Sequence, residues 1–546
     1  MHPFFQLTLA VVVSMLVIPL MRSIAPSLGL VDIPDARKVH TVPIPRVGGW
    51  GILLGSLLPL ALVYQLDPLL QSFVAGCLIL FTFGVWDDAR SVGHWTKFAG
   101  QLMAVSIVVY HGDLWVSRVP FLESALPAAL GKPFTMFALV GVINAINHSD
   151  GLDGLAAGES ILSLIALAVL GYLSGSALVV SISLATIGGI LGFLRYNSHP
   201  AYVFMGDCGS QVLGFTLGFL VVYLTQAANT AVSAVLPLLI LGLPIADILV
   251  VFYRRARARM NWFKATRNHV HHRFMALGFD HYQTVVIIYS IHAAFVVSAI
   301  LARYETDVAV ALIYAVGVTA LFATLGSAER AGWHVPRCRG VELRLARSIG
   351  VLKANKAVLK GPLLVITAST PTVMLLSALS IAHIPTDVAT AAAVLALAAA
   401  IQLLWPRVVN PVLLRLAIYA TASLPAYLLI SYPGAIQHGA QSLIMVAVIV
   451  LGVAIVAYVR FSAEHQFGTT PTDFLIVLIA CGVAALSALG RIGMDSRNIV
   501  QAVLFATVLL YACEIIVCST SCISSRRLLQ VSTLATLLII TFRGVL

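Results

Sequence analysis

Two aspartates lie in a glycine-rich turn between apolar segments, in residues 144–158, which read NAINHSDGLDGLAAG. Asp150 and Asp153 are three residues apart, close to one helical turn, so both can face one site if the turn continues into a helix. A carboxylate is costly at a membrane span unless it faces a polar or water-filled site. The turn therefore predicts a polar site at the end of a span.

Further carboxylates stand at similar places in the chain. Asp87 and Asp88 follow an apolar run, and Asp207 lies in the stretch MGDCGS at an expected helix start. Five carboxylates around one cavity repel one another unless a cation lies among them, and Mg²⁺ is held by a few carboxylates together with water and substrate phosphates. The alternative interpretation is that each aspartate is solvated and caps a helix.

A cluster of bases occurs later, in the stretch RNHVHHRF, and it consists of Arg267, His269, His271, His272 and Arg273. Arg and imidazole N–H groups bind phosphate oxygens well. A zinc site is one alternative, although no cysteine stands at ligand spacing, and a basic loop that holds anionic lipid is another. With the carboxylates, the cluster favours phosphoryl chemistry on a diphosphate. There is no P-loop motif and no GxGxxG after a strand.

The composition is that of an integral membrane protein. Of 546 residues, 60% are hydrophobic and 10% are charged, and the mean hydropathy is +0.98. Apolar stretches long enough to cross a bilayer as helices recur along the chain, and strand-like alternation is absent. The prediction is an all-α polytopic transmembrane bundle of about 17 or 18 spans. The seven cysteines show no CxxC pair, so no disulfide framework is expected.

The basic residues predict the orientation of the spans. Candidate spans lie near 4–21, 47–65, 71–86, 98–111, 133–147, 159–174, 177–194, 208–225, 232–253 and 282–302. If the N-terminus is outside, the inside loops up to residue 281 hold fourteen Lys and Arg, and the outside loops hold two. This positive-inside bias places every polar motif on the cytoplasmic face, and it accounts for the net charge of +11 without nucleic acid as a partner.

Six motifs resemble those of the polyprenyl-phosphate N-acetylhexosamine-1-phosphate transferases: ARKVHTVPIPRVGG, FGVWDD, NAINHSDGLDGLAAG, NSHPAYVFMGDCGS, LPIADILVVFYRR and HVHHRF. They occur in the family order, over roughly residues 1–320. The His-Val-His-His-Arg form resembles the N-acetylglucosamine branch more than the muramoyl-pentapeptide branch. His148 departs from the family, which usually has an apolar residue there, and a neutral effect on the sugar or nucleotide pocket is the simpler reading.

The resemblance implies a bacterial inner-membrane enzyme with its catalytic face in the cytoplasm. It implies transfer of an N-acetylhexosamine-1-phosphate, in this branch GlcNAc-1-phosphate, from a UDP-sugar to undecaprenyl phosphate, with release of UMP. Such a step initiates a cell-envelope glycan, in cell-wall or lipopolysaccharide biosynthesis. The implied cofactor is Mg²⁺, with Mn²⁺ as an alternative, and a homodimer is left open.

The resemblance also implies roles for particular residues. Asp207 is implied as a metal ligand and Asp87 as the base for the lipid phosphate, with Asp88 assisting the metal or that phosphate. The other implied substrate-binding residues contact the nucleotide-sugar or its phosphates, and they are Lys38, His40, Lys97, Asn144, Asn147, Asp150, Asp153, Asn197, Arg267, His269, His271, His272 and Arg273.

The chain is predicted to divide into a catalytic membrane domain, 1–325, a basic cytoplasmic linker, 326–361, and a further helical membrane domain of unknown role, 362–546. In the last part, Arg415 and Glu514 fall inside spans and are candidates for function or for a structural pair. Two rival functions for the whole chain are a transporter or flippase of lipid-linked sugars and a non-catalytic scaffold. Transporters usually place their binding residues near mid-membrane between inverted repeats, whereas these motifs share one face.

Overall fold

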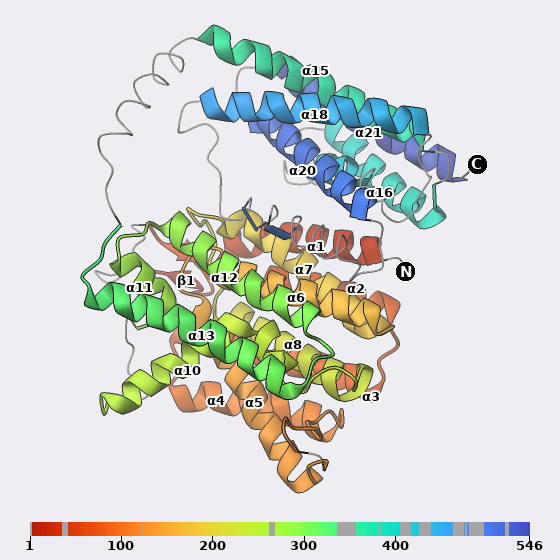
Figure 1. Ribbon diagram of the computed structural model, residues 1–546. Helices are drawn as coiled ribbons and strands as arrows, with labels where there is room; N and C mark the ends of the chain where they lie inside the picture. Colours follow the sequence, from red (N-terminus) through yellow and green to blue (C-terminus); the bar gives the residue numbers. More distant parts are fainter. Residues whose placement is uncertain are drawn as a thin grey trace. The chain divides into compact units, whose positions relative to one another are not determined.

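The structure is a computed structural model. It describes residues 3–34, 42–122, 124–260, 268–335, 356–381, 384–404, 417–424, 428, 438–461, 474–475, 478–479, 496–518 and 523–545. Most of these residues are helical (Figure 1), and the one sheet in the described part is the two-stranded antiparallel pair β1 (Val31–Asp32) and β2 (Ile44–Pro45). The prediction of an all-α bundle is confirmed.

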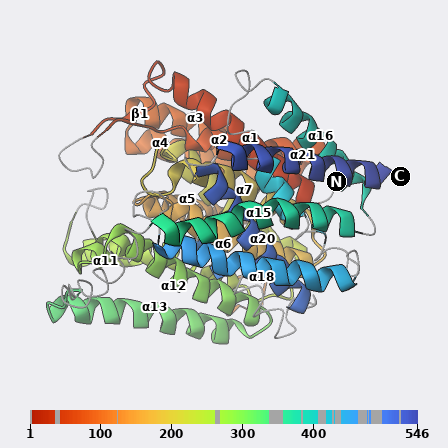
Figure 2. The same ribbon diagram turned by 90° about the horizontal axis from the view of Figure 1, so that it is seen from above.

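The chain forms two compact units. The larger comprises Gln6–Val335 and Thr470–Leu478, and the smaller comprises Met1–Phe5, Pro336–Thr469 and Ile479–Leu546. In the smaller unit α15 packs against α18 and α21, and α16 packs against α21 (Figure 2). Its described helices are α15 (Lys356–Ser380), α16 (Thr386–Leu404), α18 (His438–Phe461), α20 (Ser496–Cys518) and α21 (Ile523–Val545).

The larger unit carries all the polar motifs. Its helices are α1 (Pro3–Ile24), α2 (Gly48–Val63), α3 (Pro68–Arg90), α4 (His94–Tyr110), α5 (Ala128–Ser149), α6 (Leu155–Leu173), α7 (Ala177–Asn197), α8 (Asp207–Tyr223), η1 (Leu224–Ala228), α9 (Leu236–Ile240), α10 (Gly242–Arg257), α11 (Val270–Ala276), α12 (His281–Leu301) and α13 (Asp307–Arg330). The described parts of most motifs stand at the ends of these helices or in the loops that join them, whereas LPIADILVVFYRR makes up most of α10.

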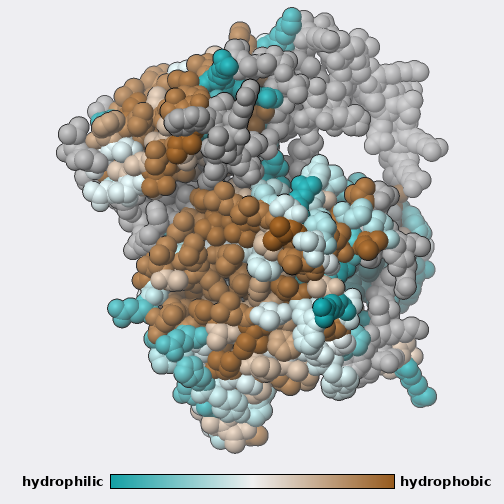
Figure 3. Space-filling view, turned by 180° about the vertical axis from the view of Figure 1, so that it is seen from behind, coloured by the Kyte–Doolittle hydropathy of each residue, from teal (hydrophilic) through white to brown (hydrophobic). Residues whose placement is uncertain are grey.

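Eight described helices are long and apolar enough to cross a membrane, and five shorter apolar helices accompany them. Large apolar side chains remain exposed, among them Leu62 (61%), Phe137 (78%) and Val316 (66%). Figure 3 shows a broad apolar surface on one side of the molecule. Such a surface is stable next to lipid and not in water, so this is a multi-pass membrane protein. The predicted total of 17 or 18 spans extends over residues outside the described part and stays a prediction.

Two details of the predicted spans are wrong. The span expected at 232–253 is not continuous, because the chain breaks between α9 and α10 at Leu241. Pro237 and Pro244 lack the N–H groups that would carry one helix through this region. In addition, α13 is long and apolar enough to cross a membrane, whereas the sequence predicts no membrane span there. Since α13 reaches Arg330, the first residues of the predicted linker are helical, and residues 336–355 lie outside the described part.

Helix α8 forms the centre of the larger unit. Of an apolar 18-residue stretch within Asp207–Ala228, 94% is buried. It packs closely against α3 and α5 because glycines let the backbones approach. A Cβ on Gly84 of α3 would lie 2.4 Å from Cys208 Cα, and one on Gly214 of α8 would lie 2.7 Å from Ile143 Cα of α5. These contacts fix the ends of α3, α5 and α8 relative to one another. Cys77 and Cys208 are buried free thiols, as is Cys513 of the smaller unit.

Replacing Gly84 with alanine is expected to destabilise the larger unit by about 1–3 kcal/mol, because backbone atoms of α8 cannot move aside for a methyl group. Thermal unfolding in detergent measures the change. Gly141→Ala in α5 is the matched control, since a Cβ there meets nothing within 4 Å. Equal unfolding temperatures for the two variants would contradict the close α3–α8 contact.

Candidate functional site

Helical spacing places the polar side chains of three helices in one cluster. Lys97 and Gln101 are four residues apart on α4, Asn144 and Asn147 are three apart on α5, and Asp207 and Gln211 are four apart on α8. Residues at these spacings share one helix face. Because α4 packs against α5 and α5 against α8, the three faces meet.

The centre of this cluster is the ammonium group of Lys97, which lies between two carboxylates. Its Nζ is 2.6 Å from Asp87 Oδ2 and 2.5 Å from Asp207 Oδ2. The other oxygen of Asp87, Oδ1, is buried and has no hydrogen-bond partner in the structure. An unpaired carboxylate oxygen is costly when buried, so it indicates a binding position for a cation or a donor group.

Asp88 differs from its neighbour, because its carboxylate binds the start of α8. Oδ1 accepts a hydrogen bond from Asp207 N at 3.0 Å, and Oδ2 accepts one from Cys208 N at 3.2 Å. Both N–H groups belong to the first turn of the helix, which lacks internal acceptors. Gly206, with φ of +77°, precedes this turn, and a Cβ there would lie 2.5 Å from Asp88 Oδ2. The role that this geometry gives Asp88 is to position Asp207.

Amide side chains hold Asp207 from the other side. Asn147 Nδ2 donates to Asp207 Oδ1 at 2.8 Å and lies 2.8 Å from Ser210 Oγ. Asn144 Nδ2 donates to Gln101 Oε1 at 2.9 Å, and Gln101 Nε2 donates to Gln211 Oε1 at 3.3 Å. This chain of hydrogen bonds links α4, α5 and α8 beneath the carboxylates.

The turn after α5 does not continue into a helix, which corrects one sequence expectation. Gly154, with φ of +78°, separates the turn from α6. The Asp153 carboxylate faces His199, with Oδ2 2.7 Å from Nδ1 of the imidazole. Burial, and then the charges of Asp207 and Asp88, raise the pKa of Asp150 to about 7.

Asn197 at the end of α7 supports this turn from beneath. It is buried, its Oδ1 accepts from Gly154 N at 2.8 Å, and its Nδ2 donates to Val203 O at 2.9 Å. Backbone groups therefore engage both ends of its amide. The structure gives Asn197 the role of joining the turn 150–154 to the loop that leads to Asp207.

The histidine cluster is oriented by Asp247 of α10. His269 Nδ1 lies 2.7 Å from Asp247 Oδ2, and Val270 N donates to Asp247 Oδ1 at 2.9 Å. A carboxylate at Nδ1 holds the proton there and leaves Nε2 as the free ring nitrogen. The ring of His269 stacks on that of His148, with centroids 5.5 Å apart.

His271 joins the histidine cluster to the aspartate turn. A Cβ on Gly151 would lie 2.4 Å from His271 Nε2, so the imidazole rests on the backbone of the turn. Burial, and then the neighbouring His272 and His269, lower the pKa of His271 to about 3. His271 is therefore a neutral imidazole at physiological pH.

The guanidinium of Arg273 forms an ion pair with another side chain of the protein. Its Nε lies 2.6 Å from Glu329 Oε1 and its Nη2 3.0 Å from Glu329 Oε2, a two-point ion pair between α11 and α13. The remaining residues of the predicted set, Lys38, His40 and Arg267, lie outside the described residues. In the smaller unit Glu514 accepts a hydrogen bond from Tyr419, and Arg415 lies outside the described residues.

Several residues of the site escaped the sequence reading. Gln101, Ser210 and Gln211 stand one helical turn from predicted residues, so their spacing was a usable signal. Asp247 lies in one of the quoted motifs, but its pairing with His269 joins residues 22 positions apart. No sequence pattern predicted that contact.

Comparison with known proteins identifies the family to which the chain belongs. The sequence profile of Glycosyl transferase family 4 matches residues 70–225, which hold Asp87, Lys97 and Asp207. A Bacillus subtilis protein named "Probable undecaprenyl-phosphate N-acetylglucosaminyl 1-phosphate transferase" is 36% identical over 308 residues, covering 86% of that protein and 55% of this chain. The chain belongs to this transferase family.

Two other members of the family show similar coverage. The undecaprenyl-phosphate alpha-N-acetylglucosaminyl 1-phosphate transferase of Escherichia coli K12 is 30% identical over 338 residues, covering 92% of that protein and 60% of this chain. The decaprenyl-phosphate N-acetylglucosaminephosphotransferase of Mycobacterium tuberculosis H37Rv is 34% identical over 310 residues, covering 74% of that protein and 49% of this chain. In each case a large part of this chain lies outside the match.

Proposed function

We propose that the protein transfers N-acetylglucosamine-1-phosphate from UDP-N-acetylglucosamine to undecaprenyl phosphate and releases UMP, as the first step of a cell-envelope glycan. The relatives are named for transfer of this sugar phosphate to a polyprenyl phosphate. The observation that carries the proposal is the convergence of Asp87, Lys97 and Asp207 at the ends of three helices, α3, α4 and α8.

Each group in this cluster has a use in phosphoryl transfer. The lipid phosphate oxygen attacks the β-phosphorus of the UDP-sugar, and the bond to UMP breaks. Asp87 accepts the proton of the lipid phosphate, and Lys97 offsets the negative charge of the phosphates. The free ring nitrogen of His269 and the neutral ring of His271 hold the donor by hydrogen bonds. Positioning by fixed groups supplies most of the acceleration in such reactions.

The residues fit a divalent cation of the Mg²⁺ class. Asp87 Oδ1 is a buried carboxylate oxygen without a partner, and Asp207 offers a second hard oxygen nearby. Asp207 and Asp87 would hold the ion, and Asp88, whose oxygens bind the helix start, would support Asp207. When bound, the ion neutralises charge on the diphosphate and on the leaving UMP. Mn²⁺ has the same ligand preference.

The membrane placement follows the positive-inside bias of the loops. We propose that the carboxylate cluster faces the cytoplasm of a bacterial inner membrane, where a soluble UDP-sugar reaches it. The site consists of residues within 87–273 of one chain, so it does not need a second copy, and a homodimer stays open. A flippase is less well supported, because the polar residues gather at helix ends rather than at mid-membrane.

The test is UMP release by purified protein in detergent with undecaprenyl phosphate and Mg²⁺. UDP-N-acetylglucosamine should give the largest rate, above UDP-N-acetylgalactosamine and UDP-glucose. Omission of undecaprenyl phosphate is the control, and release should then fall to background. If no UDP-sugar gives UMP above that background, the proposal is wrong.

Asp247→Asn should lower the turnover by at least about 100-fold, because His269 then loses the partner that fixes its proton on Nδ1. The pH profile of turnover should also change, which simple loss of stability would not cause. Asp280→Asn is the control: Asp280 caps α12 through Gln283 N, and asparagine caps equally well. Wild-type turnover and an unchanged profile in Asp247→Asn would remove Asp247 from the site.

A chain that stops after Val335 should insert and keep measurable transfer, because the site lies within the larger compact unit. A shorter chain ending at Arg303 is the control. It lacks Glu329, the partner of Arg273 beside the histidine cluster, and should be inactive. A folded Val335 truncation without UMP release would show that the smaller unit completes the site.

A further inference from the structure

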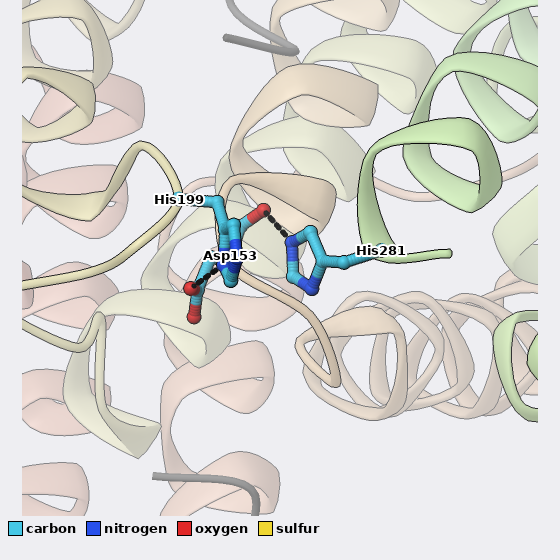
Figure 4. A group of neighbouring side chains, drawn as sticks. All are labelled: Asp153, His199 and His281. Atoms are coloured by element: carbon cyan, nitrogen blue, oxygen red, sulfur yellow. Dashed lines mark hydrogen bonds and ion pairs between the residues drawn. The ribbon is translucent and has the colours of Figure 1, made fainter. Parts of the chain in front are cut away.

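Beside the carboxylate cluster, three metal-ligating side chains gather at a second position (Figure 4). They are Asp153 of the turn after α5, His199 of the loop between α7 and α8, and His281, the first residue of α12. One ligand atom of each lies within 4.8 Å of the other two, and the two imidazole rings stack with centroids 4.0 Å apart. Among the described residues, no other three His, Cys, Asp or Glu side chains meet this distance.

The backbone around these side chains is held in place by contacts of its own. Ala201 N donates to Asp153 Oδ2 at 3.1 Å, and Tyr289 OH donates to the carbonyl of Gly154 at 2.7 Å. His281 follows Asp280, which forms a reciprocal capping box with Gln283 at the start of α12. The three ligands therefore come from fixed segments, which lowers the cost of gathering them around an ion.

The donor set selects the class of ion. Two imidazole nitrogens and one carboxylate oxygen suit Zn²⁺, Co²⁺ or Ni²⁺, whereas Mg²⁺ prefers oxygen ligands alone. We propose that Asp153, His199 and His281 bind one divalent transition-metal ion, with Zn²⁺ as the natural occupant. Three protein ligands leave a fourth position for water, as in open zinc sites. This site is separate from the one proposed for Mg²⁺ at Asp87 and Asp207.

The three side chains must shift for the ion to enter, because their ligand atoms are now up to 4.8 Å apart. Zn–N and Zn–O bonds of about 2.0–2.1 Å place tetrahedral ligands roughly 3.3 Å apart. His199 Nδ1 and Asp153 Oδ2, now 2.7 Å apart around a shared proton, must therefore separate by about 0.6 Å and release that proton. The side chain of His199 is 44% exposed, so it can rotate by this amount and ions can reach it.

Binding would join three segments that surround the proposed active site. One is the turn that carries Asp150, the second is the loop that leads to Asp207, and the third is α12. An ion that binds the folded chain alone stabilises it, so Zn²⁺ should raise the unfolding temperature of the wild-type protein.

The experiment is a Co²⁺ titration of the purified full-length protein, previously stripped with a chelator, followed by the visible d–d absorption of bound Co²⁺. About one Co²⁺ per chain is expected, displaced by Zn²⁺ and retained in excess Mg²⁺. His199→Gln and His281→Gln should each abolish this absorption and the Zn²⁺ effect on unfolding. His334→Gln, which alters an exposed histidine after α13, should retain both.

Three outcomes would overturn the site. The first is absence of Co²⁺ binding by the wild-type chain. The second is unchanged Co²⁺ binding in both His199→Gln and His281→Gln, with the unfolding temperature of each variant measured to show that it is folded. The third is loss of binding in His271→Gln with binding kept in His281→Gln, which would place the ion in the 269–272 cluster. Because no UDP-sugar is present, these results do not depend on whether the proposed transfer reaction occurs.

Discussion

Asp207→Asn is expected to reduce UMP release by about three orders of magnitude while the protein still folds and inserts. Asparagine keeps the volume and an oxygen that accepts from Asn147 Nδ2, but it removes the negative charge. Lys97 Nζ, now 2.5 Å from Asp207 Oδ2, would then face an amide, and a hard cation would lose a ligand. Both losses act where charge develops during transfer.

The measurement is turnover per folded protein, together with the unfolding temperature. Asp113→Asn is the matched control, because Asp113 is 76% exposed and pairs with Lys132 away from the cluster. That variant should be as active as the wild type. Near-normal turnover in Asp207→Asn would remove Asp207 from the centre of the site.

Asp87→Asn should reduce turnover at neutral pH by about 100- to 1,000-fold, since asparagine removes the negative charge that would hold the cation beside Lys97. If Asp87 also takes the proton of the lipid phosphate, raising the pH replaces that part of its role, because a phosphate monoester loses its second proton near a pKa of about 6. The ratio of variant to wild-type turnover should therefore rise between about pH 5.5 and 7.5.

The competing mechanism makes Asp87 or Asp88 a nucleophile that carries the sugar phosphate covalently. The ratio would then stay low at every pH, and incubation with UDP-sugar alone would leave label on the wild-type protein. Asp67→Asn, at the other end of α3, is the control, since asparagine caps the helix as aspartate does. Its turnover should match the wild type throughout the pH range.

The sequence predicted the fold class and the site residues correctly wherever one helix face or one motif determined which side chains meet. The membrane class follows from the composition, and Lys97, Asn147 and Asp207 meet because each stands at a helix end beside a close helix contact. The break at Leu241 was missed because the run 232–253 is apolar throughout, and hydropathy does not record where prolines end a helix. The span of α13 was overlooked although it is among the most apolar.

What the sequence could not give is the partner of each polar group. The spacing groups Asp153 with Asp150, yet the turn ends at Gly154, which has a positive φ, and the Asp153 carboxylate pairs with His199. The sequence predicts a phosphate contact for Arg273, whereas in the structure its guanidinium pairs with Glu329 of α13. Such pairs join residues more than 40 positions apart, so only the packing of helices reveals them.

The central claim is that the phosphate moves together with the sugar, and UDP-N-acetylglucosamine labelled with ³²P at the β-phosphate tests it most directly. The purified protein is incubated with this donor and undecaprenyl phosphate, and the lipid and water-soluble products are separated. The account predicts that the label passes to the lipid and that the nucleotide product is unlabelled UMP. Label that stays with the nucleotide as UDP, while the sugar reaches the lipid, would contradict it.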